Sequence, residues 1–320
     1  MFQQDISNFL VYLKSAHTSQ KYLKNCYIQN QIQDPEKRSY QNCYRFLYYL
    51  EHGQAFYQSG IKSDIVIKPI LFFYGMVHLL KACLLTKRPD YPENTAMLSH
   101  GVSTRKLKKQ QYAFLNDEIK IQHKGLFPYF SKYLFEVNQL PFQKINMNQL
   151  LAAIPELNDL FMHHRGSGKL TKIGYLKESI LTFDSSLLDS YHITETNFIN
   201  KLTNYLVGIE SNLNDKDKIM ITLSKPLSPS SKGPFFFHAS EEAFYFPKSR
   251  HYFSTSHEVM NHYLLLYNLS MISRYETEWW GDLLHTLPTE DYPFIQQFLT
   301  VTSTKVPTLL GYFLLKQHKD

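Results

Sequence analysis

The most apolar stretch of the chain, Ile65 to Leu85, constrains the fold more than any other segment. Lys68, His78 and Lys81 interrupt this stretch. Its longest uncharged run, Ile70 to Val77, is far shorter than the roughly 20 residues that a membrane-spanning helix needs. We therefore expect a buried core helix here and no membrane anchor. A chain of 320 residues is long enough to bury such a helix in one large core or in two smaller ones.

Helical periodicity predicts a mainly α, multi-helix globular fold. Apolar residues recur at steps of three and four within residues 9–16, 44–56 and 259–272. Helices are also expected over 103–115 and 147–160, and Thr194 is a candidate N-cap for a helix over 197–209. Weak alternation after Asp215 and a loop rich in Pro and Ser predict short strands over 219–223, 234–237 and 243–246.

These patterns divide the chain into three expected parts. Residues 1–214 form a helical domain, and residues 215–253 form a small β-containing insertion. Residues 254–320 are expected to add C-terminal helices that pack on the first domain.

The cysteines and the N-terminus favour a cytoplasmic protein. Cys26, Cys43 and Cys83 are an odd number without a close pair, which argues against a disulfide framework and against a zinc ribbon. The first residues lack the basic start and the cleavage site of a secretory signal. His257 and His262 are five residues apart and would lie on different faces of a helix, so we expect no metal site and no cofactor.

Positive charge is concentrated in one short segment. Residues 101–132 contain seven Lys and Arg but two Asp and Glu. Ser103 or Thr104 is a plausible helix N-cap, and cations in the first turn of a helix oppose its dipole unless an anion is bound there. The segment therefore indicates either a site for a phosphate-bearing ligand or an ordinary solvated basic face. The cations that follow the expected cap are Arg105, Lys106, Lys108 and Lys109.

A second cluster, Arg274, Tyr275, Trp279 and Trp280, contains both tryptophans of the chain. Trp, Tyr and Arg dominate the energetic centres of protein interfaces, so the cluster is a candidate partner-binding surface. A structural oligomer that assembles through this cluster is one hypothesis for the function of the protein. The alternative is the end of a helix packed over the core.

Arg45 and His52 form a candidate catalytic pair. Their spacing fits the loose Arg and His pattern of the helical HEPN ribonucleases, although fourteen histidines make such spacings easy to obtain by chance. If they act, they would cleave RNA without a metal ion, with both polar groups flanking the scissile phosphate.

Three stretches together resemble the YaaC-like protein family of Gram-positive bacteria. They are IKPILFFYGMVHLLKACLL, LSHGVSTRKLKKQQY and LSMISRYETEWWGDLL. The resemblance extends over nearly the whole chain. It implies a family pattern, without an established catalytic role, at His100, Gly101, Arg274, Tyr275 and either Trp279 or Trp280. Members are often encoded beside IMP dehydrogenase, which implies a link to purine metabolism.

From the residues and the resemblance we expect a non-enzymatic binding or regulatory protein that engages an anionic ligand or a protein partner. IMP dehydrogenase is the first partner to test, and a metal-independent ribonuclease is the alternative. A nucleic acid is a less favoured partner, because the basic segment is short and few aromatic residues lie within it. The expected ligand-binding residues are His100, Gly101, Ser103, Thr104 and the four cations from Arg105 to Lys109.

Overall fold

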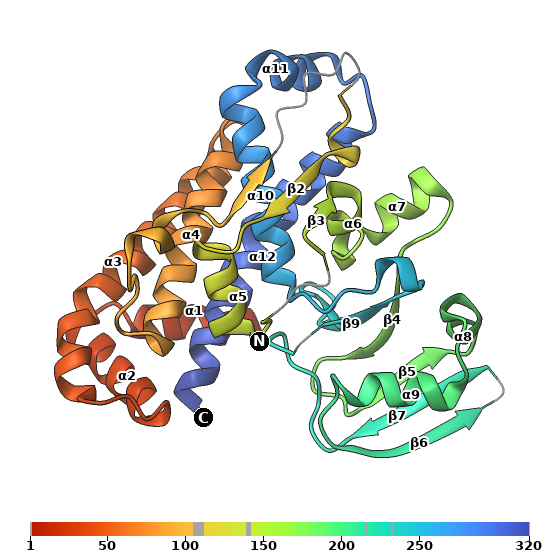
Figure 1. Ribbon diagram of the computed structural model, residues 1–320, viewed down its shortest axis with the longest axis horizontal. Coiled ribbons are helices and arrows are strands. Elements are labelled where there is room, and N and C mark those ends of the chain that lie inside the picture. The colour runs from red at the N-terminus through yellow and green to blue at the C-terminus, as the bar shows by residue number, and fades with distance from the viewer. Residues whose placement is uncertain (1, 105–111, 139–141, 216, 232, 320) are drawn as a thin grey trace. The chain divides into compact units, whose positions relative to one another are not determined.

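The computed structural model describes residues 2–104, 112–138, 142–215, 217–231 and 233–319 and divides them into two compact units (Figure 1). The first unit comprises Met1–Met147 and His262–Asp320, and the second comprises Asn148–Asn261. Helices predominate and strands form small antiparallel sheets, which confirms the predicted mainly α fold.

Four helices begin the first unit: α1 (Phe2–Tyr12), α2 (Ala16–Gln29), α3 (Pro35–Lys62) and α4 (Lys68–Lys87). Ser15 caps α2 by accepting a hydrogen bond from the backbone N–H of Thr18. Proline stands in the first turn of both α3 and α4, where its missing N–H costs nothing. The expected core helix is thus confirmed as α4, which packs against α3, α2, α5 (Leu126–Phe135) and α12 (Asp291–Lys319).

The close packing of α3 on α4 depends on glycines. A Cβ added to Gly53 would lie 2.6 Å from Leu79, and one added to Gly75 would lie 2.8 Å from Tyr57. A larger residue at either position would push the two helices apart. Because the candidate site described below draws side chains from both helices, this spacing determines how its groups meet.

Among the described residues two helices, α4 and the window Asp291–His318 of α12, are long and apolar enough to cross a membrane by length and composition. In α4 72% of the apolar window is buried, and in α12 67% is buried. Core helices of soluble proteins pass the same test, so these helices are weak evidence for a membrane span.

The remaining elements of the first unit are a three-stranded sheet, short helices and the C-terminal helices. The antiparallel sheet has the order β1-β2-β3, with Val102 of β1 opposite Ile121 of β2 and Glu118 of β2 opposite Asn146 of β3. The bounds of these remaining helices and strands are η1 (Thr95–Leu98), β1 (Val102–Thr104), η2 (Phe114–Asn116), β2 (Glu118–Ile121), α5 (Leu126–Phe135), β3 (Lys144–Asn146), α10 (Glu258–Tyr275), α11 (Thr277–Thr286) and α12 (Asp291–Lys319).

This sheet corrects the prediction of one helix over residues 103–115. Ser103 and Thr104 belong to β1, and the 3-10 helix η2 begins only at Phe114. Two buried carboxylates hold the segment that follows. Asp291 accepts the backbone N–H groups of Phe114 and Leu115, at 2.9 and 3.1 Å, and Asp117 accepts the Tyr112 hydroxyl at 2.6 Å.

The second unit contains two three-stranded antiparallel sheets, of order β4-β9-β8 and β5-β7-β6. Its core is aromatic: the rings of Phe183, Tyr191 and Phe198 all lie within 6 Å of the Phe246 ring. Its elements are α6 (Met147–Leu151), which begins at the unit boundary, η3 (Pro155–Leu157), α7 (Asn158–Arg165), β4 (Leu170–Tyr175), β5 (Ile180–Asp184), α8 (Ser186–Tyr191), α9 (Glu195–Thr203), β6 (Ile209–Asp215), β7 (Lys218–Leu223), β8 (Phe236–His238), β9 (Ala243–Pro247) and η4 (Arg250–Tyr252).

Several local predictions for this unit are confirmed. The Thr194 hydroxyl accepts the backbone N–H of Asn197 and caps α9, although this helix ends at Thr203 and a strand begins at Ile209. Strands occur at the three expected places, as β7, β8 and β9. The expected insertion, residues 215–253, lies inside a longer unit that begins at Asn148 and contains the additional strands β4, β5 and β6.

Candidate functional site

Facing sides of α3 and α4 carry aromatic and basic side chains. Tyr74, His78 and Lys81 lie at steps of four and three on α4, so they share one face of that helix. The His78 ring stacks on Phe56 of α3, with centroids 5.7 Å apart, and meets the His52 ring edge-on at 5.3 Å. Basic groups thus lie between aromatic rings along this pair of helices.

His100 is added to this face by the loop before β1. Its ring lies 5.0 Å from Phe73 and 5.5 Å from Tyr267 of α10. Its carbonyl accepts the Tyr263 hydroxyl at 2.9 Å and the backbone N–H of Phe127 at 3.1 Å. The backbone that carries the imidazole is therefore fixed on two sides.

Gly101 has a backbone role in this arrangement. Its φ of 76° lies in the left-handed region, and an added Cβ would lie 2.5 Å from Pro128. A Cβ on Gly125 would lie 2.4 Å from the Cα of Gly101. The pair His100 and Gly101 therefore allows the loop to cross the start of α5 at close range.

Arg274 of α10 joins the same cluster. Its Nε donates a hydrogen bond to the carbonyl of Ser270 at 2.8 Å, and its guanidinium lies 5.9 Å from the centre of the Tyr74 ring. The Tyr74 ring in turn lies 6.3 Å from the His100 ring. His100 and Arg274, which the sequence placed in separate candidate sites, thus both lie near the ring of one tyrosine.

The histidine, lysine and arginine side chains brought together here are all basic. Burial, followed by the positive charges of Arg274 and Lys81, lowers the pKa of His100. Burial, Lys81 and His52 together lower the pKa of His78 to about 4. Within the described part of the chain neither Lys81 nor Arg274 forms an ion pair with a carboxylate. We call His78, Lys81, His100 and Arg274 the basic cluster.

An open concavity lies beside His100. It is lined by His100, Gly101 and Tyr267, and by His123 and Lys124 from the turn after β2. Lysine and histidine side chains therefore surround a hollow with an aromatic wall. Such a hollow can bind an anion through charge and a planar ring through stacking.

The predicted basic helix start falls only partly within the described residues. Ser103 and Thr104 lie in the strand β1, where the Ser103 hydroxyl accepts a hydrogen bond from Gln122 at 2.6 Å. Arg105, Lys106, Lys108 and Lys109 lie outside the described residues.

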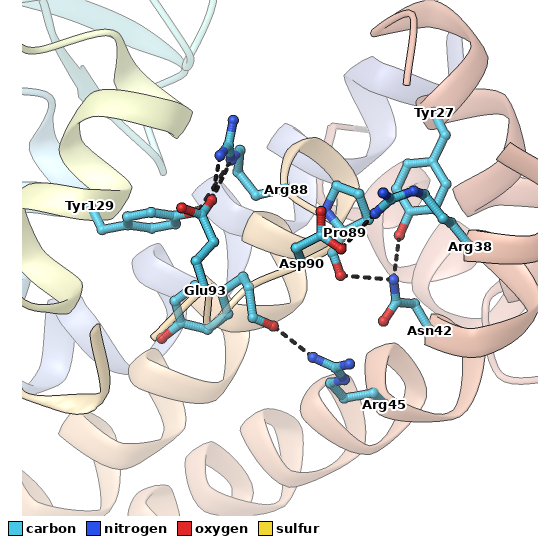
Figure 2. Close-up of polar contacts among 10 residues, drawn as sticks. Tyr27, Arg38, Asn42, Arg45, Arg88, Pro89, Asp90, Glu93 and Tyr129 are labelled. Carbon is cyan, nitrogen blue, oxygen red and sulfur yellow. Dashed lines mark hydrogen bonds and ion pairs between the residues drawn. The ribbon is translucent and has the colours of Figure 1, made fainter. Parts of the chain in front are cut away.

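The candidate catalytic pair Arg45 and His52 lies on the exposed side of α3. Figure 2 shows the Arg45 guanidinium among the contacts that hold residues 88–93, and its Nη1 donates to the carbonyl of Tyr91 at 2.6 Å. Arg45 thus anchors a backbone segment, while His52 contacts His78 of the basic cluster.

Residues 88–93 are held by several such contacts (Figure 2). Asn42 donates to the carbonyl of Pro89 at 3.0 Å, and Arg38 forms an ion pair with Asp90. Glu93 pairs with Arg88 and accepts the Tyr129 hydroxyl. This network connects α3, the end of α4 and α5, and it fixes the chain just before the loop that carries His100.

The expected partner-binding residues occupy different environments. Trp280 is 2% exposed, and its indole N–H donates to the carbonyl of Val66 at 3.0 Å. Trp279 is half-buried against the Tyr112 ring, with centroids 4.7 Å apart, whereas Tyr275 is 59% exposed. Trp280 is therefore part of the core of the first unit and offers no exposed indole surface.

His257 and His262 each have at least one ring nitrogen in a hydrogen-bonding contact with another group of the protein. The Nδ1 of His257 accepts the backbone N–H of Val259 at 3.2 Å, which leaves Nε2 as the donor to the carbonyl of Pro229. His262 Nδ1 contacts the Thr302 hydroxyl at 2.9 Å. Among the described residues no group of three or more His, Cys, Asp or Glu side chains is placed to hold a metal ion.

In the sequence, His78 and Lys81 stand out only as interruptions of an apolar helix. Their spacing of three residues places them on one side of α4, and a lysine on the face of a core helix was the available indication that this face meets a ligand or solvent. His123 and Lys124 carried no such indication, because their contribution depends on the turn after β2.

The fold and the cluster define a mainly helical protein with a half-buried basic and aromatic site. The chain belongs to the YaaC-like protein family, whose family model matches residues 11–314. The same comparisons give no match to a curated protein or to a solved structure.

Proposed function

We propose that this protein is a cytoplasmic, non-enzymatic binding or regulatory protein whose basic cluster takes a phosphate-bearing ligand. The observation that carries the proposal is that Lys81 and Arg274 lie near enough to His100 to lower its pKa, while neither cation forms an ion pair with a carboxylate among the described residues. Burial and the nearby cations disfavour the protonated form of His100, and a bound anion would favour that form and pair with the cations.

The aromatic wall narrows the ligand class. Tyr267 lines the hollow beside His100, and Tyr74 lies under the Arg274 guanidinium. An aromatic ring in the ligand can stack on such side chains while its phosphate meets the cations. A purine nucleoside monophosphate satisfies both requirements and agrees with the link to purine metabolism that the family resemblance implies.

Calorimetric titration with IMP and with inorganic phosphate tests this proposal. Replacing Lys81 by Met keeps the length of the side chain and removes its charge, so we expect IMP affinity to fall by about tenfold or more, the effect of one charged hydrogen bond. Lys21→Met, on the exposed side of α2, is the matched control and should bind normally. Equal affinity in Lys81→Met and Lys21→Met would contradict the proposed site.

A protein partner is tested separately, with IMP dehydrogenase first. Tagged protein should capture purified IMP dehydrogenase, and capture should weaken when Arg105, Lys106, Lys108 and Lys109 are all changed to Ala. Unchanged capture by this variant would exclude the basic segment as the contact. The absence of any capture would remove IMP dehydrogenase as a partner.

The ribonuclease alternative assigns catalysis to Arg45 and His52. The contact between His52 and His78 supports it, since a second imidazole beside His52 can serve as acid or base. It requires RNA cleavage that persists in EDTA and is lost in His52→Ala. A His52→Ala variant with full cleavage activity would exclude this pair.

A further inference from the structure

Three tyrosines lie exposed in a row on α3, and we call Tyr40, Tyr44 and Tyr48 the tyrosine stripe. They follow one another at steps of four residues, so they share one face of the helix. Their exposed fractions are 68%, 55% and 55%, and the rings of Tyr44 and Tyr48 lie 6.3 Å apart. Single exposed apolar residues are common on protein surfaces, whereas rings gathered in one place mark a surface that binds a partner.

The spacing of the stripe matches a ligand that is a chain of flat rings. Four residues of helix rise about 6 Å, so the tyrosines succeed one another at about that interval along α3. His52 and Phe56 continue the series at the same step, and both rings contact the His78 ring of the basic cluster. Successive bases of a single nucleic acid strand stack on aromatic side chains that are arranged in such a series.

Two cations lie beside the stripe. Lys37 precedes Tyr40 by three residues and Arg45 precedes Tyr48 by three residues, which makes each cation a neighbour of a ring on the helix surface. Both side chains are exposed, and neither forms an ion pair with a carboxylate among the described residues. One N–H of Arg45 is donated to the carbonyl of Tyr91, and a guanidinium has five such donors.

The carboxylates of α3 do not balance these cations. The helix contains two carboxylates, and Glu36 forms an ion pair with Lys24 of α2. Glu51 is the other carboxylate. On the same side Lys81 of α4 adds a further cation, whose Nζ lies 5.7 Å from the centre of the Tyr49 ring. The surface therefore combines exposed rings with an excess of positive charge, which is complementary to bases joined by phosphates.

We infer that the tyrosine stripe binds single-stranded nucleic acid, with successive bases stacked on its three rings and the phosphates beside Lys37 and Arg45. Every base has a flat face, so this surface binds strands of different sequence. The inference concerns binding and assigns no cleavage. It does not rest on the proposed purine nucleotide, because the three tyrosines are not members of the basic cluster.

Fluorescence anisotropy of the full chain with fluorescein-labelled oligo-dT and oligo-rU tests this inference. Stacking does not require a 2′-hydroxyl, so we expect both strands to bind. Each should bind at least about tenfold more tightly than a duplex of oligo-dT with oligo-dA, in which neighbouring pairs cover the faces of the bases. Equal affinity for strand and duplex would overturn the inference, because charge alone would then account for binding. Absence of binding to both strands would overturn it as well.

Substitution of single tyrosines tests the rings. Tyr44→Leu and Tyr48→Leu should each weaken oligo-dT binding by about fivefold or more, the effect of losing one stacked base. Tyr44→Phe keeps the ring and should bind normally. The matched control is Tyr175→Leu, at a tyrosine of β4 that is 45% exposed, and it should also bind normally. Normal binding by both stripe variants would contradict the assignment.

The salt dependence of binding tests the phosphate contacts. Lys37→Met should reduce the slope of log affinity against log salt concentration by about 0.7, the contribution of one phosphate contact on a single strand. Lys21→Met, on the exposed side of α2, should leave the slope unchanged. An unchanged slope in Lys37→Met would refute the placement of the strand beside this lysine.

Titration of Tyr44→Leu with IMP keeps this inference separate from the proposed function. We expect this variant to bind IMP as the wild type does while it loses affinity for oligo-dT. A parallel loss of both ligands would overturn the assignment of a separate surface. If the wild-type protein binds oligo-dT but not IMP, the purine nucleotide proposal fails and the tyrosine stripe stands.

Discussion

Replacing His78 by Gln should change how the stability of the protein depends on pH. Burial, Lys81 and His52 lower the His78 pKa from 6.5 to about 4. The folded protein therefore takes up this proton later than the unfolded chain as the pH falls. Stability that is fully present above about pH 6.5 is lost between pH 6.5 and about 4, because the unfolded state binds more protons in that window.

The size of this loss follows from the same shift. A displacement from 6.5 to about 4 corresponds to at most about 3 kcal/mol, and solvent screening of the half-buried ring reduces the expected effect to about 2 kcal/mol. Urea denaturation at pH 7.5 and at pH 4.5 measures it. The wild-type protein should lose about 2 kcal/mol more free energy of unfolding between these two conditions than His78→Gln does.

His285→Gln, on the exposed side of α11, is the matched control and should keep the wild-type pH dependence. Other titrating groups are common to all three proteins, so the comparison isolates His78. If His78→Gln loses as much stability at pH 4.5 as the wild type, the imidazole is not held neutral by burial and by the cations around it, and the electrostatic argument for the basic cluster fails.

Three further substitutions test the structural assignments. Asp291→Ala should cost about 2 to 4 kcal/mol in urea denaturation, because it leaves two buried backbone N–H groups without their acceptor. Trp280→Ala should cost about 3 to 5 kcal/mol without changing the mass in light scattering, whereas a structural oligomer built through this residue would dissociate. Arg45→Ala should lower stability by about 1 kcal/mol through loss of the contact to the Tyr91 carbonyl, and an unchanged unfolding midpoint would show that this contact contributes nothing.

The core helix α4 could be predicted from sequence because a long apolar run has few alternatives to burial. The strand β1 could not be predicted from the sequence in this way. It has three residues, and its formation depends on pairing with β2, where Val102 meets Ile121. Three residues are too few to show a strand pattern, whereas the sequence of the basic segment after Thr104 favours a helix. The prediction therefore extended the helix over the residues of β1.

The candidate site shows the same limit. His100 and Arg274 were both noted in the sequence, but they were assigned to different functions because they lie 174 positions apart. Only the packing of α10 beside α4 brings both near Tyr74. Similarly, Arg45 suggested chemistry, and its partner, the Tyr91 carbonyl 46 residues away, became evident only from the fold.

The contact between Trp279 and Tyr112 has a practical consequence for spectroscopy. Tyr112 directly follows the basic segment, and its ring meets the indole of Trp279 edge-on at 4.7 Å. At this separation an excited tyrosine transfers its energy to the indole, and the emission of Trp279 depends on where Tyr112 lies. Since the chain has two tryptophans and Trp280 is enclosed in the core, a change in fluorescence when a ligand is added would report mainly on Trp279. Binding that displaces Tyr112 from Trp279 can therefore be followed without attaching a dye.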